Sequence, residues 1–431
     1  MKVLMFGWEF PPHIAGGLGT ACYGMTKGLA YNDVDVLFVM PSASGDEDQS
    51  AVSIINASDI PVDTVSTTVD EFLGKVRFVH IGSNMVPYVD PQDFTQMVEE
   101  ERKRQIKGFR VQYGQKYKFS GKYGANLMEE VARYAMVGAT IALQHKDEID
   151  VIHAHDWLTY LAGIAAKQLT GKPLVVHVHA TSFDRSSDDK IDTRVYDLEK
   201  RGMEAADKVI AVSELTRNIV INKYGIDPSK VVAVHNAVDF SGRENLEVQR
   251  GTDEKVVTFL GRVTYQKGPE YFIEAAAKVL KKCNNVRFVM AGSGDMLNRC
   301  IRHVARLGIS DRFNFTGFLR GKEVQKMFAL SDVYVMPSIS EPFGISPLEA
   351  MQTNVPSIIS KQSGCAEILK YALKVDFWDV DAMSDAIYGL LQYPAISQLA
   401  ARCGYDEVNS LKWNNAAAKV KQVYEAAINQ Q

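Results

Sequence analysis

The chain has 431 residues, 46% of them hydrophobic and 23% charged, and a formal net charge of −4. This composition excludes a disordered chain, and the balance of 48 basic and 52 acidic side chains excludes the positive field of a nucleic-acid-binding protein. Five scattered cysteines without a CxxC pair argue against a disulfide framework, and no apolar run reaches the ~18 residues of a membrane span. We therefore expect a cytoplasmic protein of two or three domains without an integral membrane segment.

Short apolar runs alternate with longer amphipathic stretches through the first half of the chain. Strands are expected at Val3–Phe6, Val34–Met40, Val76–His80, Val151–His153, Leu174–His177, Val209–Val212 and Val231–Val234. Helices are expected between them, at Leu18–Leu29, Ala125–Leu143, Tyr160–Leu169 and Val195–Ala206. This alternation predicts parallel strands joined by crossover helices, in a doubly wound α/β sheet.

The rhythm stops at Asp239–Glu254, a polar and charged segment that we interpret as a linker. It resumes with strands expected at Val256–Leu260, Val286–Ala291, Phe313–Thr316, Val333–Pro337 and Ser357–Ile359. We therefore expect an N-terminal α/β domain at residues 1–240 and a C-terminal one at 255–410. A helix within 411–431 is expected to cross back to the N-terminal domain. Residues 91–124 mix charged and aromatic side chains and are predicted to form an insertion.

Two glycines, Gly16 and Gly17, lie between the first strand and the following helix. Glycines there let backbone amides approach a phosphate at the positive end of a helix. Cys22 stands where the third glycine of a GxGxxG motif would be, so a dinucleotide-binding motif is excluded. A phosphate site and a plain tight turn both stay open.

Histidines end two neighbouring strands of the first half. His153, His155 and Asp156 close one strand, and His177 and His179 close the next. Open parallel sheets bind ligands at this end, and His179, nearer the edge, is the better candidate to reach one. Helix capping by the aspartate and packed histidines are the alternatives. No metal site is expected, because no further His, Cys or Glu cluster completes a ligand shell.

Arg262 and Lys267 lie close together where a strand ends and the next helix opens. Two cations there could clamp a diphosphate and neutralise the charge that it gains on leaving. Solvated surface cations are the alternative interpretation.

The segment SEPFGISPLEAM is the most informative one. Backbone amides of Gly344, Ile345 and Ser346 would form a second anion site where a helix begins. Glu341, on the preceding loop, can reach a hydroxyl-rich group, and Glu349, in the helix, is placed to hydrogen-bond a diol such as a ribose. Pairing with the helix dipole explains Glu349 in part and Glu341 poorly.

Together these motifs resemble the retaining nucleotide-sugar glycosyltransferases of family 4, which include archaeal-type glycogen synthases. The most specific match is the EX7E pattern of Glu341 and Glu349, and it is supported by Arg262 and Lys267 in GRVTYQKG and by HAHDW at residues 153–157. The resemblance covers nearly the whole chain. It implies the GT-B architecture, two facing Rossmann-like domains with a cleft between them.

The resemblance implies how the donor is held. Gly16 and Gly17 would contact the donor phosphates, and Arg262 and Lys267 would hold the diphosphate and stabilise it as it leaves. Two cations and two helix ends then serve the leaving group, so we expect no cofactor and no metal. The expected reaction is a retaining front-side substitution through an oxocarbenium-like ion pair, with domain closure excluding water.

The resemblance also implies which residues contact the sugars. His179 would lie beside the donor sugar, and Glu341 would bind its hydroxyls. Glu349 and the amides of residues 344–346 would complete the donor site, and Asp156 would lie near the acceptor or the donor sugar. The predicted catalytic residues are therefore His179, Arg262, Lys267 and Glu341.

The acceptor is expected to be the non-reducing end of an α-1,4-glucan, because WEFPP and HAHDW are more similar to the glycogen and starch synthase branch than to lipid-directed members. Tyr113 and Tyr117 could stack on glucan rings, while the cations between them could equally meet a membrane or solvent. The lysine that precedes Gly-Gly-Leu in typical bacterial glycogen synthases is missing, which leaves ADP- and UDP-glucose both open as the donor.

Three other functions stay open. A family 4 enzyme could act on a different acceptor, such as a small sugar, a sugar phosphate or a cell-surface glycan. A nucleotide-sugar 2-epimerase shares the two-domain architecture, but the EX7E pattern disfavours it. A non-catalytic glycan binder is disfavoured because the cations and Glu341 are intact.

Overall fold

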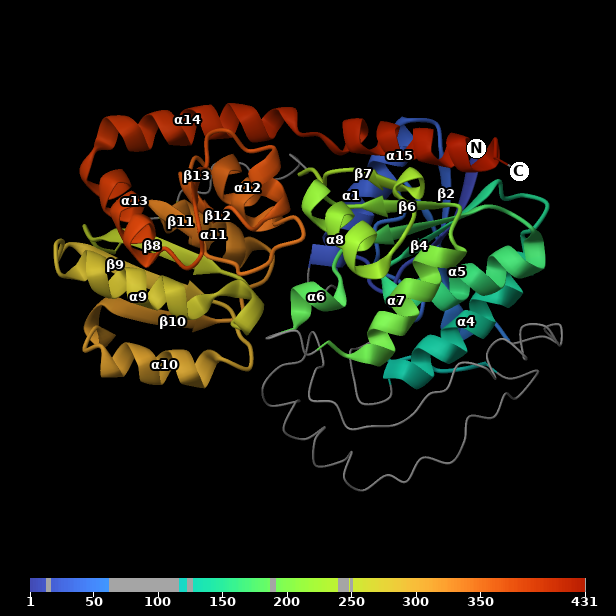
Figure 1. Cartoon of the computed structure of the whole chain (residues 1–431), viewed down its shortest axis with the longest axis horizontal. Helices are drawn as coiled ribbons and strands as arrows, with labels where there is room; N and C mark the ends of the chain where they lie inside the picture. The colour runs from blue at the N-terminus through green and yellow to red at the C-terminus, as the bar shows by residue number, and fades with distance from the viewer. Residues whose placement is uncertain are drawn as a thin grey trace, which may run out of the picture.

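The computed structural model describes residues 1–12, 17–61, 116–121, 127–186, 191–238, 248 and 251–430. Within these residues the chain forms two α/β domains that lie side by side, each built around a parallel sheet (Figure 1). The prediction of two doubly wound Rossmann-like domains is confirmed.

The N-terminal sheet has seven parallel strands in the order β3-β2-β1-β4-β5-β6-β7. Its strands are β1 (Lys2–Phe6), β2 (Asp35–Met40), β3 (Ser53–Asn56), β4 (Val151–His155), β5 (Leu174–Val178), β6 (Lys208–Ala211) and β7 (Val231–Ala233). Strands β4 and β5 are buried along their whole length, as expected where helices cover both faces of a parallel sheet. The order reverses between β1 and β4, so the loops after these two strands leave in opposite directions and open a crevice.

The helices around this sheet are α1 (Gly17–Tyr31), α4 (Leu127–Gln144), α5 (Trp157–Thr170), α6 (Ser182–Arg185), α7 (Thr193–Ala205) and α8 (Glu214–Tyr224), with 3-10 turns η1 (Ala57–Asp59) and η2 (Pro228–Lys230). Helix α8 illustrates how local sequence sets the ends. Ser213 Oγ accepts the amide of Thr216 at 3.0 Å, and Gly225 ends the helix with φ +72°. The cap and the glycine together define an eleven-residue helix.

The C-terminal sheet has six parallel strands in the order β10-β9-β8-β11-β12-β13. Its strands are β8 (Lys255–Leu260), β9 (Val286–Ala291), β10 (Phe313–Gly317), β11 (Val333–Met336), β12 (Ser357–Ser360) and β13 (Leu373–Val375). Its helices are α9 (Pro269–Leu280), α10 (Leu297–Arg306), α11 (Lys322–Leu330), α12 (Ile345–Gln352) and α13 (Val380–Gln392), with turns η3 (Tyr265–Lys267), η4 (Ser310–Arg312) and η5 (Gly364–Glu367). The strand order reverses between β8 and β11, which gives this domain a crevice of the same kind.

The two last helices run along the same side of both domains (Figure 1). Helix α14 (Pro394–Ser410) lies over the C-terminal domain, and α15 (Trp413–Ile428) packs against α1. Asn32 Nδ2 at the end of α1 donates to Asn414 O at 3.0 Å, and Lys421 Nζ donates to Asn32 O at 2.8 Å. The C-terminal helix is therefore part of the N-terminal core, to which Trp413 contributes a 6% exposed side chain.

Most strands expected from sequence are present within one or two residues of their predicted bounds. The short edge strands β3 and β13 and helix α8 were not expected, because none of them carries a long periodic apolar pattern. The expected strand Val76–His80 lies outside the described residues, as does most of the expected linker Asp239–Glu254.

Candidate active site

The predicted site residues follow the strands at which both sheets reverse their order. Gly17 begins α1 after β1, Asp156 follows β4, and His179 follows the neighbouring strand β5. In the other domain Arg262 follows β8, and Glu341 lies on the loop between β11 and α12. Ligands of open α/β sheets bind at these crevices, so the topology places these residues where a ligand is expected.

A cation and a carboxylate pair at the centre of the C-terminal crevice. Lys267 Nζ donates to Glu341 Oε2, and Ser338 Oγ donates to the same oxygen at 3.1 Å. The side chains of Lys267 and Glu341 are 20% and 9% exposed, so the pair is largely shielded from water. Lys267 ends the turn η3 instead of lying in α9, which begins two residues later. The fold therefore joins two charged groups that are 74 residues apart in sequence.

Backbone hydrogen bonds hold the loop of Glu341 on both sides. Ile339 N donates to Gln266 O at 2.8 Å, and Glu341 N donates to Gln362 O at 3.0 Å. The side chain of Gln266 accepts from Arg262 Nη2 at 3.1 Å. The predicted cations and the predicted carboxylate therefore share one framework, in which movement of η3 would displace the loop.

The beginning of α12 faces the beginning of α1 across the two domains. Ile345 Cδ1 lies 3.9 Å from the position that a Cβ atom on Gly17 would occupy. Gly344 precedes α12 with φ +95°, which is the left-handed region that glycine tolerates. Ser346 lies in the first turn of α12 and Glu349 in the next, both half-buried. The two helix ends predicted to bind phosphate therefore come together.

The beginning of α1 also receives a carboxylate that sequence reasoning missed. Glu9 is 4% exposed, and its Oε1 accepts the amide of Gly19 at 3.1 Å. This carboxylate stabilises the positive end of α1 and satisfies one of its amides. Its position in the WEFPP run, just before a helix, was the signal available in the sequence.

Asp156 organises the backbone at the end of β5. Its Oδ1 accepts the amides of His179 at 2.9 Å and Ala180 at 3.4 Å, and its side chain makes no cap hydrogen bond to α5. Burial raises the pKa of Asp156 to about 6, although the nearby Arg185 charge acts to lower it. Asp156 therefore occupies the N-cap position of α5, but its side chain holds the backbone of His179 and Ala180 instead of capping that helix.

His179 reaches the site with one ring nitrogen already engaged. Its Nε2 lies 2.9 Å from His155 Nδ1, so one of the two rings donates to the other. Burial lowers the pKa of His179 to about 3, so its ring is neutral at neutral pH. The ring can therefore offer a hydrogen bond to a ligand without adding charge.

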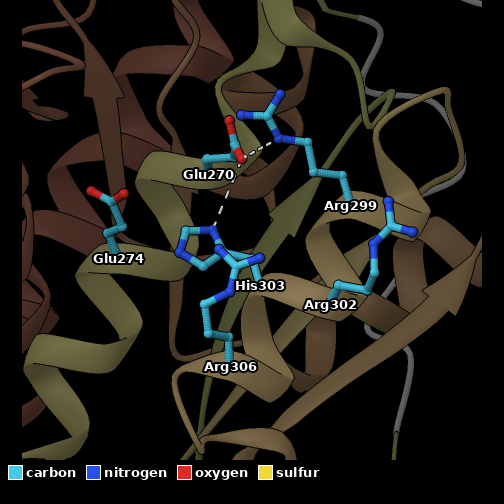
Figure 2. A pocket seen from close by; sticks show the side chains of 6 residues that line it. All are labelled: Glu270, Glu274, Arg299, Arg302, His303 and Arg306. Atoms are coloured by element: carbon cyan, nitrogen blue, oxygen red, sulfur yellow. Dashed lines mark hydrogen bonds and ion pairs between the residues drawn. The ribbon is translucent and has the colours of Figure 1, made fainter.

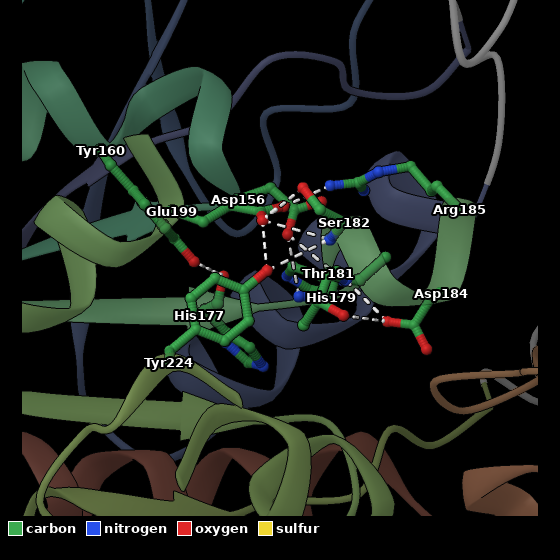
Figure 3. A network of polar contacts seen from close by, with 11 residues as sticks. Asp156, Tyr160, His177, His179, Thr181, Ser182, Asp184, Arg185, Glu199 and Tyr224 are labelled. Atoms are coloured by element: carbon green, nitrogen blue, oxygen red, sulfur yellow. Dashed lines mark hydrogen bonds and ion pairs between the residues drawn. The ribbon is translucent and has the colours of Figure 1, made fainter. Parts of the chain in front are cut away.

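Hydrogen bonds link the His179 loop to the Glu341 loop across the two domains. The amide and hydroxyl of Thr181 donate to Asp184 Oδ2 at 2.7 and 2.8 Å, and Ser340 Oγ donates to Asp184 Oδ1 at 2.6 Å. Figure 3 shows Asp184 beside Thr181, within the N-terminal domain. One aspartate thus ties the positions of the two predicted catalytic loops together.

A buried network beside the site was also missed in the sequence. Glu199 of α7 is 3% exposed, pairs with Arg185, and accepts from Ser182 Oγ at 2.7 Å and from the Tyr224 hydroxyl (Figure 3). Burial raises the pKa of Glu199, against the Arg185 charge. In sequence Glu199 fits the polar side of an amphipathic helix, so nothing distinguished it from a surface charge.

The structure brings further side chains to His153 and His155 that the sequence pattern did not indicate. One ligand-type nitrogen each of His153, His155 and His177 lie within 4.8 Å of one another. A second group of this kind consists of Cys22, His155 and His179. These additional side chains come from β5, from the loop after it and from α1, which are separated from β4 in the sequence.

Tyr117 does not present a free ring to an acceptor. It is 9% exposed and belongs to the N-terminal core, with the Arg133 guanidinium 5.2 Å from its ring centre. The expectation that Tyr117 stacks on a glucan is therefore not supported, because packing uses its ring face. Tyr113 and Gly16 lie outside the described residues.

Two family models match adjacent parts of the chain. Residues 108–241 match Glycosyltransferase Family 4, and residues 243–406 match Glycosyl transferases group 1. The chain is a glycosyltransferase of the GT-B fold.

Relatives along the full length agree with this assignment. The glycosyltransferase is 28% identical to an uncharacterized glycosyltransferase of Methanocaldococcus jannaschii, over 99% of each chain. It is 24% identical to a glycogen synthase of Mycobacterium tuberculosis, over 99% of this chain and 95% of that one.

Solved structures show the same architecture. Sucrose-phosphate synthase from Thermosynechococcus elongatus superimposes over 100% of both chains, with a TM-score of 0.70 and 17% identity. The catalytic domain of starch synthase IV from Arabidopsis thaliana, bound to ADP and acarbose, covers 99% of both chains with a TM-score of 0.65 and 15% identity. At these identities the likeness concerns the fold.

A surface hollow of this glycosyltransferase lies between α9 and α10, away from the residues discussed above (Figure 2). Its lining residues are Glu270, Glu274, Arg299, Arg302, His303 and Arg306. Glu270 pairs with Arg299 at 2.7 Å and lies 3.9 Å from His303, so the basic side chains of α10 are partly neutralised by α9.

Among the described helices, none combines the length and the apolar character needed to cross a membrane.

Proposed function

We propose that this glycosyltransferase moves glucose from ADP- or UDP-glucose to the non-reducing end of an α-1,4-glucan. The observation that carries the proposal is the pairing of Lys267 with Glu341 at the crevice, on a loop that is bonded to the His179 loop through Asp184. This arrangement supplies a cation for a leaving diphosphate and a carboxylate for sugar hydroxyls within one rigid framework.

The proposed chemistry is a retaining substitution. The bond between the anomeric carbon and the phosphate oxygen breaks, and its electron pair passes to the diphosphate. Arg262 and Lys267 neutralise the charge that develops there. The acceptor hydroxyl attacks the anomeric carbon from the face that the diphosphate leaves, and its proton passes to a leaving phosphate oxygen.

The remaining site residues bind and orient in this proposal. Glu341 accepts hydrogen bonds from donor sugar hydroxyls, and Glu349 accepts from the ribose. His179, held by His155 and Asp156, contacts the donor sugar with a neutral ring. The amides at the beginnings of α1 and α12 bind phosphate oxygens. No metal ion is required for the diphosphate in this proposal, because these cations and helix ends take that role.

Two comparisons support the glucan acceptor. The glycogen synthase of M. tuberculosis aligns over nearly the whole of both chains, and starch synthase IV has the same fold in a complex with ADP and acarbose. A small acceptor such as a sugar phosphate is the second candidate, because sucrose-phosphate synthase superimposes over the complete chain with the highest TM-score among the structures described above.

A donor and acceptor screen tests the proposal. The full chain is incubated with radiolabelled ADP-glucose or UDP-glucose and either glycogen or a panel of sugar phosphates, and products are separated by size. We expect label in the polymer, with the α configuration by NMR, and no rate increase when Mg²⁺ or Mn²⁺ is added. Label only in small products would favour the second candidate, and turnover that depends on added metal would contradict the role of the two cations.

Matched variants then test the site. We expect Glu341→Gln to reduce turnover about 100-fold or more, since it removes the charge that faces the donor sugar and leaves the shape unchanged. Asp381→Asn is the control, because Asp381 also pairs with a lysine in the same domain but is 80% exposed. Wild-type rates in both variants would refute the assignment of the site.

A further inference from the structure

Three histidines of the N-terminal sheet converge beneath the site. His153 and His155 lie two residues apart on β4 and so point to the same face. His177 on β5 is the direct neighbour of His155 in the sheet register. All three are 0% exposed, and one ligand-type nitrogen from each lies within 4.8 Å of the others.

Several ring nitrogens of these three histidines have no hydrogen-bond partner among the described residues. His153 Nε2, His155 Nε2 and both ring nitrogens of His177 are buried without a hydrogen bond to any described residue. Buried polar atoms in folded proteins are almost always satisfied by protein, water or an ion. Because each of the three rings has at least one such nitrogen, a partner shared by the three histidines would satisfy them.

The opposite edges of two of these rings are held. The hydroxyl of Tyr424 lies 2.6 Å from His153 Nδ1, and His179 Nε2 lies 2.9 Å from His155 Nδ1. Histidines that bind a metal show this arrangement, in which one nitrogen is anchored by a hydrogen bond and the other carries the ion. The third ring, that of His177, has neither nitrogen held by a hydrogen bond among the described residues, and its centre lies 5.4 Å from that of His153 and 5.2 Å from that of His155.

We propose that His153, His155 and His177 bind one divalent transition-metal ion, for which Zn²⁺ is the best match. Imidazole nitrogens suit Zn²⁺, whereas Mg²⁺ and Ca²⁺ prefer oxygen ligands. Zn–N distances of about 2.0–2.1 Å in a tetrahedral site place the nitrogens about 3.3 Å apart. The rings must therefore turn toward a common point on binding, because the ring of His177 now lies nearly parallel to those of His153 and His155. Cys22, also 0% exposed, lies in the neighbouring group with His155 and His179 and can supply a fourth ligand.

Such an ion would position the site and would not take part in the transfer. Its three histidine ligands are fully buried, so it does not reach a donor diphosphate in the crevice. It would fix the ring of His155, which holds the ring of His179. This inference rests on the cluster itself and stands or falls independently of the donor and acceptor.

Metal content of the full chain tests the proposal. The protein is expressed with Zn²⁺ in the medium, purified without a metal-affinity step, and measured by inductively coupled plasma mass spectrometry. We expect about one zinc ion per chain in the wild type. His177→Gln should lose it, and His303→Gln should keep it, since His303 lies on α10 beside Glu270 and far in the sequence from the cluster (Figure 2). Wild-type protein without metal, or His177→Gln that keeps the ion, would overturn the proposal.

A second measurement covers the case in which His177→Gln does not fold. The wild type is stripped of metal with dipicolinate and titrated with Co²⁺, whose visible absorption reports tetrahedral coordination. We expect saturation at about one equivalent, and a rise in melting temperature on addition of Zn²⁺ that Mg²⁺ does not produce. No visible band and no rise with Zn²⁺ would show that water, not a metal, satisfies these nitrogens.

Discussion

Replacing Lys267 by methionine separates the structural and the chemical roles of the Lys267–Glu341 pair. Methionine keeps much of the length of the side chain and removes the charge. Glu341 Oε2 then retains Ser338 Oγ as its hydrogen-bond donor among the contacts described above. A carboxylate that is 9% exposed would be left in the protein without its cation.

The size of the effect follows from this burial. Removing one partner of a fully buried pair costs about 3–5 kcal/mol, and the 20% exposure of Lys267 reduces the expectation to about 2–3 kcal/mol. For a domain of this size that corresponds to a fall in melting temperature of roughly 4–12 °C. The double variant Lys267→Met/Glu341→Gln leaves no uncompensated charge, so its stability should return to within about 1 kcal/mol of the wild type.

Activity should not follow stability in this cycle. If Lys267 stabilises the leaving diphosphate, Lys267→Met loses about 100- to 1000-fold in turnover, and the double variant loses at least as much, because it restores the fold but neither the cation nor the carboxylate. Melting temperature and release of nucleoside diphosphate from the donor are measured on the same samples. Lys278→Met, from the exposed pair with Asp381, is the control and should change neither by much. Recovery of turnover together with stability in the double variant would refute the catalytic roles of both Lys267 and Glu341.

Two further predictions concern backbone geometry and thiols. Gly344→Ala should cost about 1–2 kcal/mol of stability and 10- to 100-fold in turnover, because φ is +95° and a Cβ would lie 3.1 Å from Glu341 Cγ. Gly308→Ala is the control and should cost only the stability, because φ is +70° there and nothing lies within 4 Å of the added Cβ. Equal turnover in the two variants would contradict this prediction. In native protein we expect the half-exposed Cys283 and Cys403 to react with an aromatic disulfide reagent, and the three buried thiols to react only after unfolding. Burial raises the pKa of two of the buried thiols, Cys300 and Cys365, to about 12, which leaves little reactive thiolate. Rapid reaction of all five thiols would show that the core opens.

The motifs that carry the proposed chemistry were readable because each lies in a short segment. Glu341 and Glu349 are eight residues apart, and Arg262 and Lys267 are five apart, so local strand, loop and helix signals were enough to assign each pair to one strand–loop–helix segment. The same local signals predicted the parallel sheets, because buried parallel strands are continuous apolar runs. The sequence did not indicate which side chains pair with one another, such as Lys267 with Glu341 or Ser340 with Asp184.

The sequence by itself determined two α/β domains and the loops on which the candidate residues lie, since these depend on periodicity within about 20 residues. Only the tertiary structure decided which side chains meet. His177 joins His153 because β5 pairs with β4, and Glu199 is buried because α7 packs beside α5. Tyr117 turned from a candidate sugar contact into a core residue for the same reason. Burial and contact depend on the register and packing of distant segments, and a local pattern carries no record of them.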